Sequence, residues 1–363
     1  MTTILLVVGI LMLLILVHEL GHFIAAKFFR VRVEEFGIGF PPRALTFGKW
    51  GGTEYTLNWV PFGGFVRLFG DIGEGRHGQG SFVDKNRGVQ AVILAAGVFM
   101  NLVAAWALFT GALYIGIPRL VDSIEQGANQ WLLVAEVVAD SPAFAAGLSP
   151  GDRITSVVAS DGEEVTVLTP TTVSDFIQER GGESLEISYV RGGATTVVTV
   201  RSAHAVISDS AERPAIGVAL ALVSDEPLPL LVAMKDASVS TYNAFKAVLG
   251  GLWEMVKSAT NGVSPLKDIV GPIGLVGIAG AAAESGVGNI LALAAFISIN
   301  LFIINLLPIP ALDGGRLFVL GIETLIRRNA SQVAIRLLNA FGIAFIVFLM
   351  VAVTWNDIAR LFT

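Results

Sequence analysis

No cysteine occurs in this chain of 363 residues. Disulfide bonds, thiolate metal sites and cysteine nucleophiles are therefore excluded. Histidine is scarce as well, and the chain has only His18, His22, His77 and His204. Any metal ion must be bound by these imidazoles and by Asp or Glu side chains. Charged residues make up 15% of the chain and the net charge is −6, so the basic excess of a nucleic-acid-binding protein is missing. We expect no nucleic-acid partner.

Hydrophobic residues, by contrast, make up 53% of the chain. They gather in four runs, at residues 3–29, 89–117, 289–307 and 339–353. A helix needs about 20 residues to cross the apolar core of a bilayer. The first three runs are about that long or longer, and the fourth is shorter but uncharged. Buried helices of a large soluble core are the alternative, but such runs favour membrane spans.

The connections between these spans differ in charge. Residues 27–87 contain nine Lys and Arg residues, and the connection between the last two spans contains Arg316, Arg327, Arg328 and Arg336. By the positive-inside rule both connections lie in the cytoplasm. Residues 118–288 and both chain termini are then expected on the opposite, extracytoplasmic side of the membrane.

The first span contains ionisable residues, in the segment His18-Glu19-Leu20-Gly21-His22. A charged group in hydrocarbon costs about 3 kcal/mol, so this segment calls for a functional explanation. Residues four apart share one face of a helix, so both imidazoles can bind one metal ion. Glu19 would lie beside that ion and can act as a general base toward water, as in other H-E-x-x-H proteins.

Two other interpretations of this segment are weaker. A chance match on a surface helix does not explain why the motif lies within an apolar run. A signal peptide does not fit either, because no Lys or Arg precedes the run and the run continues past His22.

Residues 54–68 alternate as two strands would, and Gly63 and Gly64 allow another backbone to approach closely. An extended substrate could add to the edge of such a hairpin. A purely structural hairpin fits this pattern equally well.

The second connection begins with a soluble module. From Ser141 to Ile154 the chain reads S-P-A-F-A-A-G-L-S-P-G-D-R-I, which resembles the PDZ domains of bacterial proteases. Such domains bind extended peptides or chain ends along a strand edge. Residues 227–261 carry apolar residues at helical spacing between lysines, which predicts a pair of amphipathic helices at the membrane surface. Gly271-Pro272-Ile273-Gly274 then breaks the chain before the third span.

The third span ends in the segment Asn305 to Arg316, which contains two prolines, two glycines and Asp313. Such residues at the membrane edge predict an unwound stretch that lines a polar cavity. A catalytic zinc ion usually has three protein ligands, and Asp313 is the candidate for the third. A helix-capping role for Asp313 is the alternative.

Together, H-E-L-G-H at His18, P-F-G-G-F-V-R-L at Pro61, the PDZ signature, G-P-I-G at Gly271 and N-x-x-P-x-P-x-L-D-G-G at Asn305 resemble the site-2 protease family of intramembrane zinc proteases, of the bacterial sigma-E regulator type. The resemblance implies a Zn²⁺ ion held by His18, His22 and Asp313, with Glu19 as general base. It also implies that Asn305 holds or polarises the substrate carbonyl. The substrate backbone would pair with the strand that contains Gly63, Gly64, Phe65 and Val66.

The chain departs from the family pattern in two places. Only one PDZ domain fits between the second and third spans, where sigma-E regulator proteases have two. The second span reads Gly97-Val98-Phe99-Met100-Asn101, where many relatives have proline after the glycine. We expect this second departure to affect helix packing more than chemistry.

The predicted fold is a polytopic α-helical membrane protein with four transmembrane helices, a cytoplasmic-side β-hairpin and an inserted extracytoplasmic α+β PDZ domain. The predicted divisions are residues 1–117 with the zinc motif and hairpin, 118–204 as PDZ domain, 205–288 with a strand and membrane-surface helices, and 289–363 with the third ligand.

The predicted function, implied by the resemblance, is that of an intramembrane zinc endopeptidase of the bacterial inner membrane, with its active site toward the cytoplasm. Its substrates would be single-span membrane proteins, such as anti-sigma factors or signal-peptide remnants, after a first extracytoplasmic cut. The other expected partners are the lipid bilayer and a peptide or chain end at the PDZ domain. A PDZ scaffold with a structural metal and a metal transporter are the alternative functions.

Overall fold

The computed structural model describes residues 2–71, 77–121, 123, 129–203, 214–261, 270–328 and 330–360. The chain divides into two compact units. The helical unit comprises Met1–Ile115 and Leu228–Thr363, and the inserted unit comprises Gly116–Pro227.

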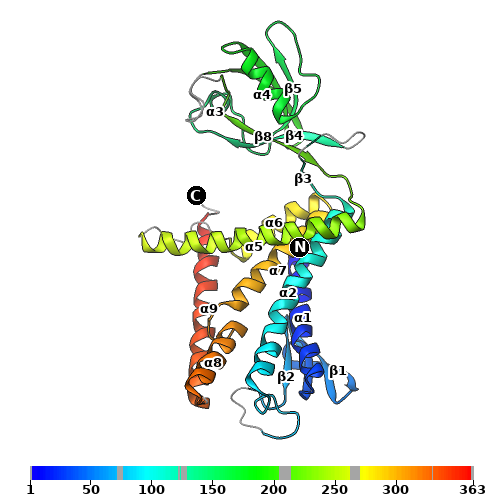
Figure 1. Cartoon of the computed structure of the whole chain (residues 1–363), viewed down its shortest axis with the longest axis vertical. Helices are drawn as coiled ribbons and strands as arrows, with labels where there is room; N and C mark the ends of the chain where they lie inside the picture. Colours follow the sequence, from blue (N-terminus) through cyan, green and yellow to red (C-terminus); the bar gives the residue numbers. More distant parts are fainter. Residues whose placement is uncertain are drawn as a thin grey trace. The chain divides into compact units, whose positions relative to one another are not determined.

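Four helices of the helical unit are long and apolar enough to cross a membrane, among the residues described. They are α1 (Thr2–Phe28), α2 (Arg87–Ile115), α7 (Val287–Leu306) and α9 (Gln332–Arg360), which correspond to the four predicted spans. Figure 1 shows them side by side, with α2 between α1 and α7. α9 begins before residue 339, the predicted start of the span. The prediction followed the uncharged apolar run, whereas the helix also includes Arg336 and other polar residues before that run.

Small residues let α1 and α2 approach closely. A Cβ atom added to Gly21 of α1 would lie only 2.4 Å from the carbonyl oxygen of Ala96 on α2. Helices in membranes commonly pack through small residues of this kind. Further along α2, Val98 and Ala105 pack with Ile299 and Phe302 of α7 in a buried apolar cluster. This packing fixes α2 as the central element of the helical unit.

One long helix, α5 (Leu230–Thr260), crosses the ends of α2 and α7 (Figure 1). The sequence predicts two helices here, but Gly250 and Gly251 do not break the helix, and a Cβ atom at either position would face open space. Trp106 of α2 donates its indole N–H to the carbonyl oxygen of Met234 at 3.2 Å, which attaches α5 to the bundle.

The G-P-I-G segment starts the next helix, α6 (Pro272–Glu284). Its first backbone N–H groups point at the buried carboxylate of Asp357, near the end of α9. Gly271 donates to Asp357 at 3.0 Å, as Gly274 does, and Ile273 donates at 3.1 Å. The orphan donors at a helix N-terminus are thus satisfied by a side chain distant in sequence.

Strands β1 (Val33–Trp50) and β2 (Thr53–Leu68) form an antiparallel hairpin at the end of the helices away from α5 (Figure 1). The hairpin folds back on itself, because the start of β1 pairs with both ends of β2. Phe36, for example, is opposite both Tyr55 and Val66. The lateral order of the segments is therefore 43–50, 53–58, 33–38 and 64–68, with residues 64–68 at an edge.

A buried carboxylate holds these segments together. Glu35 is 3% exposed and accepts from Thr56 at 2.8 Å. It also pairs with Arg43 at 2.8 Å and with Arg67 at 2.9 Å. Because its partners lie on three different segments, Glu35 fixes the position of the edge segment 64–68.

The inserted unit is a six-stranded sheet with the strand order β3-β8-β4-β5-β6-β7. The strands are β3 (Arg119–Leu120), β4 (Gln130–Val137), β5 (Arg153–Ala159), β6 (Ser184–Arg191), β7 (Ala194–Arg201) and β8 (Val218–Ser224). Helices α3 (Pro142–Ala145) and α4 (Pro170–Glu179) complete the unit. Its core is formed by apolar residues such as Leu132, Val157, Phe176 and Ile187.

The inserted unit continues past residue 204, the predicted end of its domain. β8 pairs with β4 over most of its length, for example Leu222 with Leu132. A strand near the end of the unit thus pairs with its first long strand, and the compact unit runs to Pro227.

Candidate metal centre

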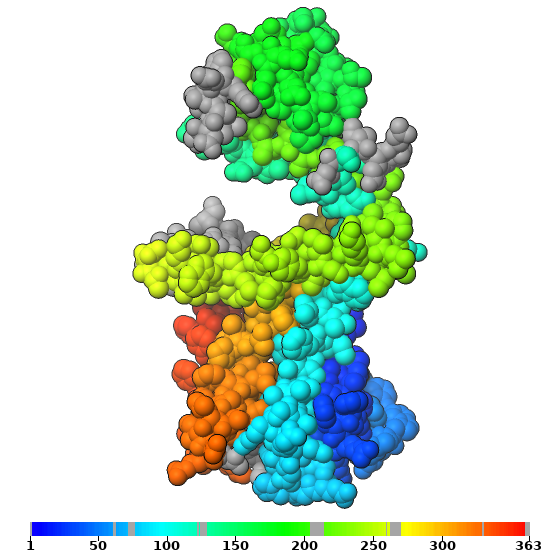
Figure 2. Space-filling model, in the orientation of Figure 1, coloured from blue at the N-terminus to red at the C-terminus, as the bar shows by residue number. Residues whose placement is uncertain are grey.

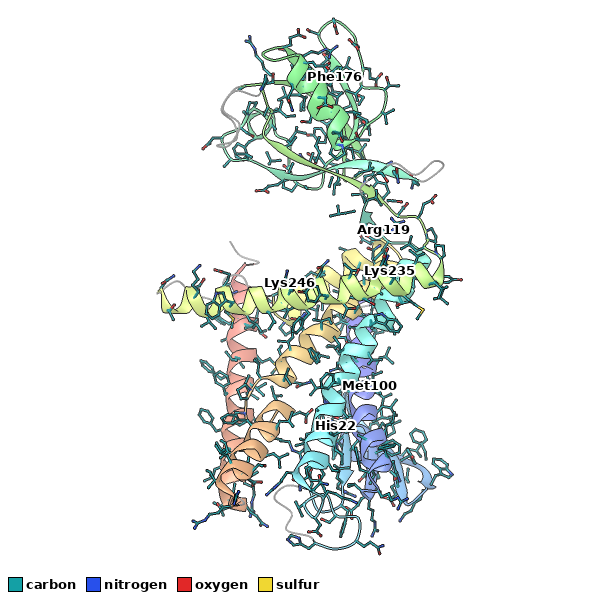
Figure 3. All side chains as sticks on the ribbon, viewed as in Figure 1. His22, Met100, Arg119, Phe176, Lys235 and Lys246 are labelled. Carbon is teal, nitrogen blue, oxygen red and sulfur yellow. The ribbon has the colours of Figure 1, made fainter. Side chains whose placement is uncertain are left out.

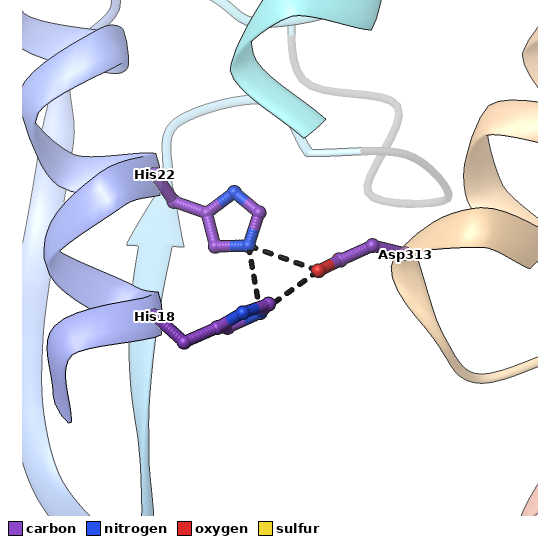
Figure 4. A group of neighbouring side chains, drawn as sticks. All are labelled: His18, His22 and Asp313. Carbon is purple, nitrogen blue, oxygen red and sulfur yellow. Dashed lines mark hydrogen bonds and ion pairs between the residues drawn. The ribbon is translucent and has the colours of Figure 1, made fainter. Parts of the chain in front are cut away.

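Three side chains from two helices converge inside the helical unit. His18 and His22 lie one turn apart on α1, and Asp313 is the first residue of α8 (Asp313–Ile326). Asp313 Oδ2 lies 2.9 Å from His18 Nε2 and 3.1 Å from His22 Nε2, and the two Nε2 atoms are 3.2 Å apart (Figure 4). The three are the only group of His, Asp and Glu residues in the described part of the chain that could hold a metal ion.

The outward nitrogen of each imidazole has its own partner on α2. His22 Nδ1 lies 2.8 Å from the carbonyl oxygen of Ile93, so it carries the proton and donates. His18 Nδ1 lies 3.2 Å from the side-chain amide of Asn101, a residue with 0% exposure, and Oδ1 of this amide is buried without a hydrogen-bond partner. With the amide turned so that Oδ1 faces the ring, His18 Nδ1 donates its proton to Oδ1 and Nε2 is left free for a metal ion. Partners of this kind fix the orientation of a ligating histidine and turn its other nitrogen toward the metal.

Gly97 of α2 provides the space in which the His22 ring lies. A Cβ atom at Gly97 would be 2.2 Å from His22 Nε2 and 2.6 Å from two ring carbons. No side chain fits there without moving the imidazole. Gly97 and Asn101 of this segment thus touch His22 and His18, while Val98, the residue that stands where many relatives have proline, packs in the apolar cluster with α7.

The chain between α7 and α8 presents Asp313 to the histidines. Gly314 packs so tightly on the end of α7 that a Cβ atom would lie 2.2 Å from the Leu307 carbonyl oxygen. The N-cap position of α8 belongs to Leu312, and α8 has no side-chain cap hydrogen bond. The capping alternative for Asp313 therefore has no support in the geometry, since its carboxylate points at the imidazoles.

Glu19 lies between the histidines in sequence but next to the hairpin in space. A Cβ atom on Gly64 would lie 3.4 Å from Glu19 Cγ, and the Glu19 carboxylate interacts with the backbone of Val66. The edge segment 64–68 is therefore the neighbour of Glu19.

Gly63 and Phe65, two other predicted substrate-binding residues, lie next to or in this edge segment. Gly63 has a φ of 97°, and a Cβ atom there would lie 2.5 Å from the Phe40 ring. The Phe65 ring fills the space beside Gly37. Asn305 is half-buried near the end of α7 and forms no hydrogen bond with another described side chain. Its neighbour Leu306 contacts Gly314, so Asn305 belongs to the same end of the bundle as Asp313.

His77 is not part of this group. His77 Nδ1 pairs with Asp84 at 2.6 Å on the surface. His204 lies outside the described residues.

The three donor atoms fit a zinc ion. Two neutral imidazoles and a carboxylate are a ligand set typical of catalytic zinc, and such sites keep one position open. The ligand atoms of a tetrahedral zinc ion are about 3.3 Å apart, given metal–ligand bonds of about 2 Å. The separations of 2.9 to 3.2 Å in the group are close to that value.

Asn101 and Gly97 were missed as site residues. A lone Asn inside an apolar span is expensive to bury, which is the signal that could have pointed to Asn101. Gly97 carries no such signal, because glycine is common in membrane helices.

Known proteins similar to this chain agree with this geometry. The model of peptidase family M50 matches residues 6–349. The chain belongs to this family, the site-2 proteases. A protein of Clostridium perfringens named as a zinc metalloprotease is 35% identical over 95% of both chains. The zinc metalloproteases RasP of Geobacillus kaustophilus and Oceanobacillus iheyensis are 28% and 29% identical, over 96% and 100% of both chains.

One solved structure is also similar. It is the PDZ domain of the SdrC-like protein from Listeria monocytogenes, 23% identical, which covers 28% of this chain and 93% of that structure with a TM-score of 0.21.

As a site-2 protease, the chain is a zinc metalloendopeptidase and a multi-pass protein of the inner membrane that acts on membrane proteins within the bilayer. The predicted enzyme class and its Zn²⁺ cofactor are thereby confirmed. The alternatives of a scaffold and a transporter have no support among these relatives.

Proposed function

We propose that His18, His22 and Asp313 are the zinc ligands of this protease and that Glu19 is its general base. The convergence of the three donor atoms carries the proposal, since each lies within 3.2 Å of the other two. Zinc, when bound, acts as a Lewis acid that activates water and polarises the carbonyl group of the scissile bond.

Glu19 accepts a proton from the attacking water and returns it to the nitrogen of the leaving chain. Its position beside Gly64 brings it to the edge of the hairpin rather than to the apolar surface of the bundle. A carboxylate in contact with the substrate-binding strand is within reach of the peptide bond that this strand holds.

The edge segment 64–68 binds the substrate as an added strand. On one side it pairs with residues 33–38, and on the other side no strand of the described residues covers it. Backbone groups at such an edge are open to another extended chain. Gly63 and Gly64 have no side chains to obstruct the approach, and Phe65 and Val66 continue the pairing.

The substrate is a single-span membrane protein already shortened by a first extracytoplasmic cut, such as an anti-sigma factor or a signal-peptide remnant. Its helix must unwind before cleavage, because helical peptide bonds are occupied by their own hydrogen bonds. Pairing with the edge segment compensates for those bonds. Asn305 then holds the carbonyl group of the extended substrate through its side-chain amide.

The active site faces the cytoplasm, and both termini are extracytoplasmic. His22 lies in the part of the bundle away from α5, which carries Lys235 and Lys246 (Figure 3). Two connections rich in Lys and Arg start from that part of the bundle, as the positive-inside rule requires of a cytoplasmic face.

The inserted unit is a PDZ domain on the opposite side of the membrane. A cavity of about 310 Å³ lies between α4 and β8, lined by Ile177, Gln178, Ile216, Val218 and Leu220 among others. β3 pairs only with Val223 and Ser224 of β8, so the segment Val218–Ala221 keeps an edge without a strand neighbour among the described residues. A peptide or chain end adds to this edge.

Replacement of Glu19 by Gln tests the mechanism. The purified, reconstituted variant should retain zinc and lose cleavage of a model transmembrane substrate by at least about 100-fold, the lower range for a general base. Cleavage at the wild-type rate would refute the assignment of Glu19. A variant that has lost both zinc and activity would indicate a structural role instead.

A further inference from the structure

We infer that a groove between the start of α2 and α8 is a binding site for an anionic phospholipid. The groove has a volume of about 560 Å³ and is lined by Ala91, Leu317, Leu320, Gly321, Arg87 and Arg327, among others. Figure 2 shows the two helices that form it, α2 in cyan and α8 in orange, at the end of the helical unit away from α5. The site is separate from the proposed zinc ligands and from the hairpin edge.

The floor of the groove is apolar and its surroundings are apolar too. Leu317 and Leu320 line the floor, and Leu320 is 3% exposed. The outer face of α8 presents large apolar side chains to its surroundings: Phe318, Ile322, Leu325 and Ile326. Such a face is stable next to lipid chains and unfavourable in water. The groove therefore opens where acyl chains are present.

Two arginines at the rim give the groove its charge. Arg87 is the first residue of α2, and Arg327 ends α8 in the left-handed conformation with a φ of 56°. Arg87 pairs with Glu323 at 2.8 Å, which holds the start of α2 and the end of α8 at one level. Arg327 forms no ion pair with any described residue, so it is the charge left over for a ligand.

A phospholipid with a net negative charge matches both the apolar floor of the groove and the arginine at its rim. Its phosphate accepts hydrogen bonds from the Arg327 guanidinium, and its acyl chain lies along Leu317 and Leu320. A free phosphate would leave the apolar floor exposed. The occupied groove would also brace α8, the helix whose first residue is Asp313.

Two variants test the contribution of the Arg327 charge and that of the apolar groove separately. Arg327→Asn removes the charge with a residue that tolerates the left-handed conformation. Gly321→Leu fills the groove, and a Cβ atom at Gly321 has no neighbour within 4 Å, so the helix itself is not strained. Arg336→Asn, at an exposed position of α9 outside the groove, is the matched control for charge.

The experiment is native mass spectrometry of the full chain released from detergent that contains phosphatidylglycerol or phosphatidylcholine. The wild type and Arg336→Asn should retain phosphatidylglycerol in preference to phosphatidylcholine. Arg327→Asn should bind phosphatidylglycerol about fivefold more weakly, as loss of one basic residue near a membrane surface predicts. Gly321→Leu should lose the adduct.

Three results would overturn the inference. Unchanged phosphatidylglycerol binding by both groove variants would place the lipid elsewhere. Displacement of the adduct by millimolar inorganic phosphate would make the ligand a free anion. A loss of affinity for the protein substrate in pure phosphatidylcholine bilayers, seen in both variants but not in Arg336→Asn, would make the occupant a segment of the substrate.

Discussion

Asn101 of α2 holds His18 of α1: its side-chain amide lies 3.2 Å from His18 Nδ1, across 83 residues of sequence. The backbone carbonyl of Asn101 also accepts a hydrogen bond from Ser298 of α7 at 2.7 Å. One residue thus connects three membrane helices at the level of the proposed zinc ligands. The proposed metal binding therefore depends on α2, which supplies none of the proposed ligands.

Replacement of Asn101 by Leu should weaken zinc binding by about 10- to 100-fold, the usual cost of removing a hydrogen-bond partner of a ligand. Asn300→Leu is the control, because Asn300 is half-buried on α7 and its side chain donates to the Phe296 carbonyl oxygen of the same helix. Titration of each purified variant with a zinc chelator measures the effect. Equal zinc affinity in the two variants would contradict the role of Asn101.

Gly97→Ala should displace the His22 imidazole, because the new Cβ would lie 2.2 Å from Nε2. We expect loss of most of the bound zinc and destabilisation by about 1 to 3 kcal/mol, as for other overpacked interiors. Gly9→Ala on α1 should have neither effect, since a Cβ atom there has no neighbour within 4 Å. Zinc analysis and thermal unfolding of both variants measure these effects. Equal zinc content in Gly97→Ala and Gly9→Ala would contradict the prediction.

Asp313→Ala should lose zinc together with activity. A residue that only caps a helix would cost about 1 kcal/mol of stability and leave the metal bound. Thr169→Ala supplies that comparison, because Thr169 caps α4 in the inserted unit. Metal analysis of the folded proteins distinguishes a ligand from a cap, and zinc retained at the wild-type level by Asp313→Ala would exclude a ligand.

The inserted unit should lose stability in acid through Asp152. Burial raises the pKa of this carboxyl, but the hydrogen bonds from Arg191 and from the Ser149 amide outweigh burial and bring the pKa below its ordinary value of 3.8. Because the folded-state pKa is the lower one, the stabilisation is complete above about pH 4 and declines as the pH falls through the folded value.

Hydrogen exchange of residues 130–203 in the full chain measures this loss. Asp152→Asn should show faster exchange at pH 7 and a smaller further change in acid than the wild type. Identical acid dependence of the two proteins would exclude Asp152 as the responsible group.

Removal of the inserted unit tests whether it gates or recruits substrates. The helical unit should tolerate the deletion of residues 116–227, because Leu228 N already lies 3.0 Å from the Leu113 carbonyl oxygen and a short linker can join the ends. Zinc content should not change.

If the unit is a gate, the deletion variant should cleave full-length substrate that the wild type rejects. Slower cleavage of pre-cut substrate by the deletion variant would indicate recruitment instead. We favour the gate, and continued rejection of the full-length substrate would refute it.

The features predicted best from the sequence are those that depend on neighbouring residues. The spacing of His18 and His22 follows from helix geometry, and the long apolar runs follow from the thickness of a bilayer. Asp313 was identifiable because acidic residues are so rare near the spans.

Contacts between distant segments were not predictable in the same way. The pairing of Phe36 with two strand segments at once depends on how the hairpin folds back. The place of β8 beside β4 depends on a strand pairing across more than 80 residues, as between Leu132 and Leu222. The room that Gly97 provides for an imidazole depends on the crossing of two helices. Local patterns contain no record of such relationships.

The contact between Asp357 and the start of α6 sets an order of assembly. During synthesis α6 emerges from the ribosome before α9, so its first N–H groups lack this partner until Asp357 has been made. Unsatisfied backbone groups cost several kcal/mol in hydrocarbon, which keeps this end of α6 near water until then. The arrival of α9 removes that penalty. Because α9 follows α8 in the chain, it is also the last helix to join the bundle that contains Asp313.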